Sequence, residues 1–185
     1  MTQFEQDGTV YDFPDEYPVL AGYDEQPFYR KLSGSEVFHA KGCDIAAIYR
    51  GNCLYLIEAK DYAHAHPGKA GKKASDLAFE VARKAFDTLA CLTVGAHHAA
   101  EEHVRQFCDK ALRCEKLCIV VTVELSRNPR TKVGLDEDKV YRGNLREMLE
   151  RNVKGLCAQR VIVTWNGDDK NDHKFWTSQW SPTHD

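Results

Sequence analysis

The fold of this chain is decided by residues 42–60, which read GCDIAAIYRGNCLYLIEAK. Two apolar arms, 44–50 and 53–60, are rich in Ile, Leu, Tyr and Ala and flank an Arg-Gly-Asn turn. Gly and Asn tolerate the positive φ angles that tight turns between paired strands require. Because apolar residues occupy both sides of each arm, the stretch predicts a β-hairpin that is covered on both faces.

The register of this hairpin decides whether its charged residues can form a site. With a two-residue loop, Asp44 would lie opposite Ala59, and Asp44 and Glu58 would occupy opposite faces, since side chains alternate along a strand. A three-residue loop instead pairs Asp44 with Glu58 and places both on one face with Lys60. Burying such charges is costly unless they are paired or bind a metal. This register predicts two carboxylates and an ammonium that converge at the end of a buried sheet.

The pattern Asp44, then Glu58-Ala59-Lys60, resembles the PD-(D/E)xK nuclease superfamily, in which an Asp leads one strand and Glu-x-Lys closes the next. The Pro that commonly precedes this Asp is replaced by Cys43. The resemblance implies an α/β fold with a restriction-endonuclease-like core, a central mixed β-sheet flanked by helices. It also implies Mg²⁺- or Mn²⁺-dependent hydrolysis of phosphodiester bonds in DNA or RNA, by an endonuclease or an exonuclease, in defence or repair.

On this resemblance, Asp44 and Glu58 would bind the metal through oxygen, the ligand type that hard cations prefer. Lys60 would orient or deprotonate the attacking water and contact the scissile phosphate. Glu36 is a further candidate metal ligand from an upstream segment, and Glu25 competes with it for that role. The structural alternative is a surface hairpin in which Glu58 and Lys60 form a solvated pair.

Five basic residues are candidates for contacts with a nucleic-acid backbone. The Gly- and Lys-containing loop 61–73 leaves the end of the strand that bears Lys60. A helix is predicted over 76–94 from the helical spacing of its apolar residues, and in the resembling fold a basic residue near the start of this helix faces the phosphate. Such charges are also typical of a solvated surface. The nucleic-acid-binding candidates are Lys69, Lys72, Lys73, Arg83 and Lys84.

Charge is distributed unevenly along the chain, which has 185 residues and a formal net charge of −3. Residues 1–29 hold seven acidic and no basic residues, so the remainder carries 25 basic and 21 acidic groups. We therefore expect an acidic, aromatic N-terminal arm over 1–29, irregular or with a short helix, and a single nuclease-like domain over 30–185. The mildly basic body permits phosphate binding without requiring it.

The cysteines and the hydropathy limit the kinds of site and the cellular location that we expect for this protein. Seven cysteines without a Cys-x-x-Cys pair argue against a disulfide framework and a structural zinc site, and most are expected to be buried thiols. No apolar run reaches the length of about 18 residues that a membrane span needs. We expect a cytoplasmic protein whose partners are nucleic acid and a homodimer mate or companion protein, with no membrane.

The remaining segments continue an α/β order, with a crossover onto the hairpin sheet. The predicted segments are a strand over 35–40, a helix over 98–113 after a break at Gly95, a buried strand over 117–125, a loop over 126–142, a helix from an Asn144 cap to a Gly155 stop, and a hairpin of strands 160–165 and 174–180.

Two other functions fit the same sequence. A nuclease fold that no longer cuts would act as a binding module or partner-recruited subunit, and would bind nucleic acid or protein without metal. A thiol hydrolase would pair one cysteine with a histidine such as His39 or His64, but no local cysteine-protease signature accompanies them.

Overall fold

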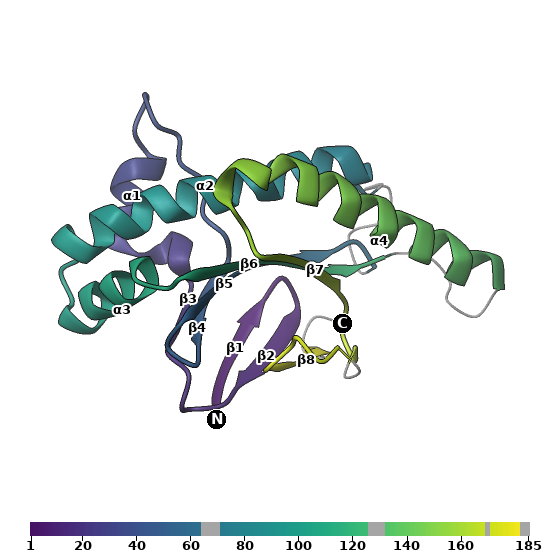
Figure 1. Ribbon diagram of the computed structural model, residues 1–185, viewed down its shortest axis with the longest axis horizontal. Helices are drawn as coiled ribbons and strands as arrows, with labels where there is room; N and C mark the ends of the chain where they lie inside the picture. Colours follow the sequence, from purple (N-terminus) through teal and green to yellow (C-terminus); the bar gives the residue numbers. More distant parts are fainter. Residues whose placement is uncertain (64–70, 126–131, 169–170, 182–185) are drawn as a thin grey trace.

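The computed structural model describes residues 1–63, 71–125, 132–168 and 171–181, which form three layers (Figure 1). The middle layer is a mixed five-stranded sheet in the order β3 (Val19–Ala21), β4 (Ile45–Tyr49), β5 (Cys53–Asp61), β6 (Lys116–Glu124) and β7 (Arg160–Thr164). One face of it carries a smaller antiparallel sheet of β1 (Thr2–Gln6), β2 (Thr9–Phe13) and β8 (Thr177–Trp180). The other face carries the helices α1 (Pro27–Ser33), α2 (Ala74–His98), α3 (Glu102–Leu112) and α4 (Lys132–Asn152).

This architecture confirms the expected α/β class with a mixed sheet and flanking helices. The small sheet was not expected from the sequence. Two short 3-10 helices, Tyr23–Glu25 and Lys154–Leu156, complete the described elements.

A three-residue loop joins β4 and β5. This is the register that places Asp44 and Glu58 on one face. Its Cα pairs begin at the turn with Tyr49 and Cys53 and end with Ile45 and Ile57. Asp44 directly precedes this last pair, so it lies opposite Glu58. The predicted register is confirmed, and the aligned face is the one that packs against the helices, since Leu54 and Leu56 lie in the helix-side core.

β6 runs parallel to β5, and β7 runs parallel to β6. The predicted buried strand over 117–125 and the crossover are therefore confirmed. Helices α2 and α3 connect β5 to β6, and α4 leads from β6 toward β7 (Figure 1). As a result, the carboxyl ends of β5, β6 and β7 share one edge of the sheet, where Lys60 lies.

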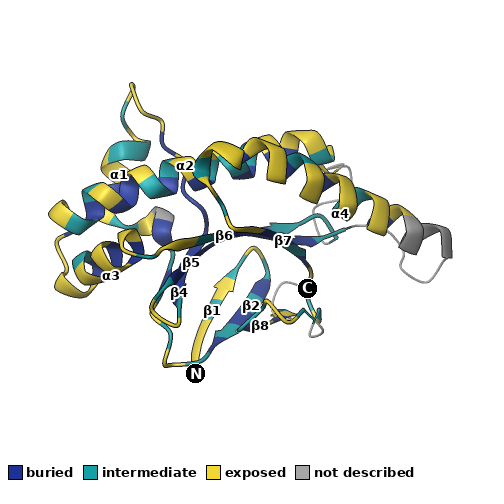
Figure 2. Cartoon of the chain, in the orientation of Figure 1, coloured by how far each residue is buried: buried dark blue, intermediate teal, exposed yellow. Residues whose placement is uncertain are grey.

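Helix α2 lies along the sheet through one continuous buried stripe, and Figure 2 shows the exposed residues of the helices on the side away from the sheet. It extends beyond the predicted end at 94, and Gly95 lies within it instead of breaking it. A Cβ on Gly95 would lie 2.7 Å from Cys108 Sγ and 2.9 Å from Phe28 Cζ, so the glycine allows α3 and α1 to pack closely. The stripe has the spacing of a helix face and consists of Leu77, Ala78, Val81, Ala85, Thr88, Cys91, Leu92 and Gly95.

The N-terminal residues 1–29 are not the irregular arm that their composition suggested. β1 and β2 form a hairpin, and β2 pairs with β8 from the other end of the chain. β3 pairs with β4 and so belongs to the main sheet. The alternation of buried and partly buried residues in β2, which buries Tyr11 and Phe13, is the local reason for the strand.

Three other predicted segments were wrong. Residues 36–38 form a turn instead of a strand over 35–40. Helix α4 begins inside the predicted loop 126–142, of which 126–131 lie outside the described residues, so Asn144 lies within the helix and does not cap it. The predicted helix through Leu145 and Leu149 is confirmed, and both residues are buried. β7 and β8 belong to different sheets, so 160–165 and 174–180 form no hairpin.

Candidate functional site

Four charged side chains meet at the carboxyl end of β5, on the face that packs against the helices. The Oε1 atom of Glu58 lies 2.6 Å from the Nζ of Lys60 and 2.6 Å from the Nζ of Lys84. The Lys84 Nζ also lies 3.6 Å from Asp44 Oδ1. We call Asp44, Glu58, Lys60 and Lys84 the charged cluster. The three residues expected from the hairpin are thus together, and α2 adds a second ammonium.

The cluster is largely removed from water. Glu58 is fully buried, and the side chains of Asp44, Lys84 and Lys60 are 9%, 15% and 17% exposed. Lysine and glutamate are rarely buried to this degree unless they are paired. The pairing is therefore what allows these charges to remain in the interior.

Backbone hydrogen bonds hold Asp44 at the start of β4. The Ala59 N–H donates to Asp44 Oδ2 at 2.7 Å. In a strand, the N–H and C=O of one residue point to the same side, so the Ala59 carbonyl is also directed toward the Asp44 side of β5. Asp44 therefore continues the hydrogen bonding of β5 one residue beyond the end of β4.

A second set of hydrogen bonds fixes α2 relative to this strand. The Cys43 N–H donates to Thr88 Oγ1 at 2.8 Å, and the Thr88 hydroxyl donates to the Lys84 carbonyl at 2.7 Å. Thr88 is fully buried. These bonds join the residue before Asp44 to the helical turn that bears Lys84, and so they orient Lys84 toward the two carboxylates.

The second carboxylate oxygen of Glu58, Oε2, is buried and has no hydrogen-bond partner among the described residues. Buried polar atoms without partners are uncommon in folded proteins. Together with Asp44 and the Ala59 carbonyl, it makes a set of oxygen donors of the kind that hard divalent cations use. No group of three or more His, Cys, Asp or Glu side chains suited to a metal occurs in the described ranges.

Burial and charge shift the pKa values of the cluster. Burial raises the pKa of Glu58 to about 7, and repulsion from Asp44 adds to this. Burial also raises the pKa of Asp44, against the attraction of Lys84 and Lys60. Burial alone would lower the pKa of each lysine, but the attraction of Glu58 and Asp44 together outweighs it, so the pKa values of both lysines are raised. At neutral pH the lysines are charged while Glu58 is near its midpoint.

Asp7 lies beside the cluster and was not predicted as a site residue. Its Oδ2 is 3.9 Å from the Nζ of Lys60. Asp7 and Gly8 form the turn between β1 and β2, with φ values of 48° and 70°. A Cβ on Gly8 would lie 2.4 Å from the Trp180 ring, so only glycine allows this contact. The Asp-Gly pair between two alternating stretches is a hairpin signal that the sequence carries.

The other predicted site residues lie outside the cluster. Lys72 pairs with Glu80, and Lys73 is an exposed residue that precedes α2. Arg83 is exposed and its Nε lies 3.8 Å from Asp87 Oδ2, although its neighbour Lys84 points inward. Glu36 is exposed in the turn after α1 and is not brought into the buried cluster. Lys69 lies outside the described residues.

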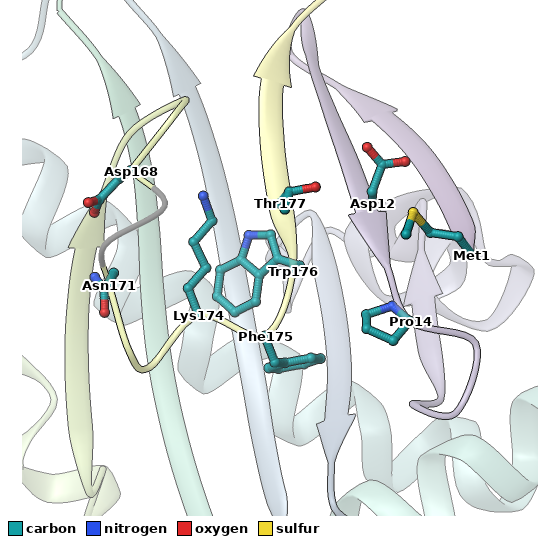
Figure 3. Close-up of a pocket in the computed structure, with 9 residues that line it drawn as sticks. All are labelled: Met1, Asp12, Pro14, Asp168, Asn171, Lys174, Phe175, Trp176 and Thr177. Carbon is teal, nitrogen blue, oxygen red and sulfur yellow. The ribbon is translucent and has the colours of Figure 1, made fainter.

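A separate hollow lies beside the small sheet (Figure 3). It has a volume of about 340 Å³, and its lining includes Asp12, Asp168, Lys174 and Trp176. The Lys174 Nζ donates to the Ser178 hydroxyl at 2.9 Å. The hollow contains no member of the charged cluster, so it is distinct from the candidate site.

Comparisons with known proteins do not assign this chain to a family. No family model matches the chain, and no match to a solved structure was found. A cysteine–tRNA ligase from Neisseria meningitidis serogroup A / serotype 4A is 28% identical over 151 residues, which cover 68% of this chain and 21% of that protein. The chain thus spans about a fifth of the length of the curated protein it matches. In the part of the chain that the structure describes, no helix has both the length and the apolar character needed to cross a membrane.

Proposed function

We propose that this protein is a divalent-metal-dependent nuclease of the PD-(D/E)xK type, which hydrolyses phosphodiester bonds in DNA or RNA. The observation that carries the proposal is the convergence of Asp44, Glu58 and Lys60 on one buried face at the end of a hairpin. Of the two registers that the sequence left possible, only the one with the three-residue loop allows that convergence. The mixed sheet around the hairpin supports the proposal at the level of fold class.

The donor set fits Mg²⁺ or Mn²⁺. Asp44 and Glu58, with the Ala59 carbonyl, would hold the ion, and the Glu58 Oε2 atom has no described partner that would have to be displaced. The Lys84 ammonium contacts both carboxylates and so marks a position where positive charge is strongly favoured. When bound, the ion would stabilise charge on the phosphate and lower the pKa of a water molecule.

The lysines have separate tasks in this proposal. Lys60 is the more exposed of the two and reaches the rim of the cluster, where it would hold a non-bridging phosphate oxygen and orient the attacking water. Lys84 approaches from α2 and would neutralise the carboxylates until the cation arrives, and would then be free to contact the phosphate. Both tasks require charged ammonium groups, which the neighbouring carboxylates favour.

Trp165 lies at the same edge of the main sheet as Lys60, and we call its exposed indole the aromatic platform. Trp165 follows Thr164, the Cα partner of Thr122, whereas Lys60 pairs with Val123. Trp165 is therefore in the same row as Lys60, two strand spacings or about 10 Å away. The indole is 37% exposed, and the Arg142 guanidinium lies 4.3 Å from its ring centroid. An indole covered by a guanidinium can stack a nucleobase, as in proteins that bind single strands.

The platform gives a test of substrate binding that is separate from chemistry. Trp165→Ala should raise KM for single-stranded substrate by about tenfold, because stacking of one base contributes about 1–3 kcal/mol. The turnover number should change little. An unchanged KM would show that Trp165 does not bind the substrate. It would not affect the roles proposed for the charged cluster.

The proposed activity is tested by incubating the purified protein with labelled double-stranded DNA, single-stranded DNA and RNA. The RNA set includes a tRNA, because the name of the matched protein specifies tRNA. Each substrate is tested with Mg²⁺, Mn²⁺ and EDTA, using the wild type, Glu58→Gln and the control Glu102→Gln, which makes the same change at an exposed carboxylate on α3. We expect metal-dependent cleavage that is lost in Glu58→Gln and kept in Glu102→Gln.

Two outcomes would overturn this assignment. Cleavage that persists in Glu58→Gln would place the chemistry elsewhere. Metal-independent binding of nucleic acid without cleavage would favour the binding module, in which Lys60 and Lys84 only neutralise buried carboxylates.

A further inference from the structure

A pair of thiols lies at the opposite end of β5 from the charged cluster. The Sγ atoms of Cys53 and Cys118 are 3.4 Å apart and share a hydrogen bond. Cys53 is the first residue of β5, and Cys118 lies near the start of β6. Both belong to the core on the side of the small sheet. The pair is therefore separated from Glu58 and Lys60 by most of the length of the strand and by the sheet itself.

An open cavity of about 450 Å³ borders both thiols. Three cationic side chains, Arg50, Lys116 and Arg160, line it, and none of its described lining residues is acidic. A volume of this size suits a small organic molecule. The cations would attract a ligand that carries negative charge.

The surroundings make Cys118 the more reactive member of the pair. The hydrogen bond with Cys53 lowers the pKa of Cys118 to about 7, and the charges of Arg160 and Lys116 act in the same direction, although burial opposes them. The thiolate is the nucleophilic form of cysteine. Cys118 is therefore the member of the pair that favours the thiolate, and its largely buried sulfur borders this cavity.

The backbone geometry opposes an internal disulfide. Lys116 is the Cα partner of Cys53, and Tyr55 is the partner of Cys118, so the two cysteines are diagonal neighbours. Two residues along a strand and one strand spacing separate their Cα atoms by about 8 Å. Disulfides need Cα atoms within about 7 Å. The pair can share a proton but cannot form a bridge without movement of the backbone.

We propose that Cys118 is a modification site that forms mixed disulfides with small disulfides bearing carboxylate groups, and that Cys53 activates it as a hydrogen-bond donor. The Cys118 thiolate attacks one sulfur of the small disulfide, whose S–S bond breaks as the new bond forms. The departing thiolate takes a proton from water. The Cys118 sulfur is oxidised, one sulfur of the small molecule is reduced to a thiol, and no other oxidant is needed.

The test uses the full chain and three probes of different charge: oxidised glutathione, 2-hydroxyethyl disulfide and cystamine. Adducts are counted by intact mass and located by peptide mapping, and rates are compared at low and high salt. We expect the first adduct at Cys118, formed at least about tenfold faster with oxidised glutathione than with cystamine at low salt, whereas the rate at Cys157 should depend less on the charge of the probe. The adduct should persist, because Cys53 cannot displace it. Cys157, which is exposed, provides an internal reference thiol.

Variants separate this site from general thiol reactivity. The double variant Lys116→Gln, Arg160→Gln should abolish the preference for the anionic probe. Cys53→Ala should slow the reaction, whereas Cys53→Ser should largely retain it, because a hydroxyl still donates. Adducts confined to Cys157, equal rates for the three probes, or a Cys53–Cys118 disulfide as the main product would each overturn the proposal. Mapping on the wild type decides the matter even if a variant fails to fold.

Discussion

The two ends of β5 hold buried reactive groups of different kinds. At the carboxyl end, Glu58 and Asp44 present hard oxygen atoms that two lysines of the same chain neutralise. At the amino end, Cys53 and Cys118 present soft sulfur atoms beside an open cavity lined by cations. The first end is closed by its own side chains, whereas the second has space for an added molecule.

This difference determines how each end of β5 would bind a ligand. At the charged cluster a cation would neutralise carboxylates that Lys84 already neutralises, so binding and stability are coupled. At the thiol pair a ligand fills existing space, so the fold depends little on the site. Changes at the charged cluster should therefore affect stability, metal binding and turnover together, and changes at the thiol pair should not.

The largest effect is expected from removing the cation that contacts both carboxylates. Lys84→Met leaves Asp44 and Glu58 facing each other with one lysine fewer, and should lower the free energy of unfolding by about 3–5 kcal/mol. Cys53→Ala at the other end should cost only about 1 kcal/mol. Urea denaturation of both variants checks this, and saturating Mn²⁺ should restore part of the loss in Lys84→Met. Equal losses of unfolding free energy in Lys84→Met and Cys53→Ala would contradict the proposed difference between the two ends of β5.

Turnover should depend on Lys60 without a matching dependence of metal binding. Lys60→Gln keeps both carboxylates but loses the ammonium at the rim, so the turnover number should fall by about 10²–10³-fold. Mn²⁺ affinity should stay close to that of the wild type. Single-turnover cleavage and Mn²⁺ titration on the same preparation measure the two quantities, with Lys110→Gln, a change of an exposed lysine on α3, as the matched control. Loss of Mn²⁺ binding in Lys60→Gln would contradict separate roles.

Metal affinity should depend on pH near neutrality. The pKa of Glu58 is raised to about 7, so the carboxyl group is protonated below that pH and cannot bind a cation. Each pH unit below about 7 should therefore weaken Mn²⁺ binding by about tenfold, and the affinity should level off above it. Titrations from pH 5.5 to 8.5 test this. An affinity that is flat across pH 7 would show that Glu58 is not a ligand.

The smallest effect is expected at Asp7. Its carboxylate is 48% exposed and 3.9 Å from the Lys60 Nζ, so the pair is weak. Asp7→Asn should change the free energy of unfolding by less than about 1 kcal/mol. Cleavage should change by less than about tenfold. A larger loss of cleavage with unchanged stability would make Asp7 a further member of the site.

The hairpin was predictable because it depends on local patterns, whereas its register stayed open between two loop lengths. The turn residues fixed the loop length to two choices, and the alternation of side chains showed which choice brings Asp44 beside Glu58. Lys84 was named beside Arg83 as a candidate contact with nucleic acid, but its inward direction was not predicted, although the helical period indicates it. It lies three residues after Val81 and four before Thr88, both buried, so the helical period already placed it on the inward face.

The small sheet could not be predicted because it depends on contacts between distant segments. β2 pairs with β8, and more than 160 residues separate these strands along the chain. Composition also misled at the start of α4, where the charged residues of 126–142 suggested a loop although the helix begins at Lys132; the helix over Leu145 and Leu149 was predicted. The thiol pair likewise depends on the pairing of β5 with β6, which no spacing of cysteines in the sequence reveals.

The central claim is that Asp44 and Glu58 hold a divalent cation, and calorimetric titration with Mn²⁺ at pH 8 tests it most directly. We predict one ion per chain for the wild type and for Cys118→Ser, and a loss of affinity of at least about tenfold in Asp44→Asn and in Glu58→Gln. Absence of binding to the folded wild type, or equal binding to all four proteins, would contradict the claim.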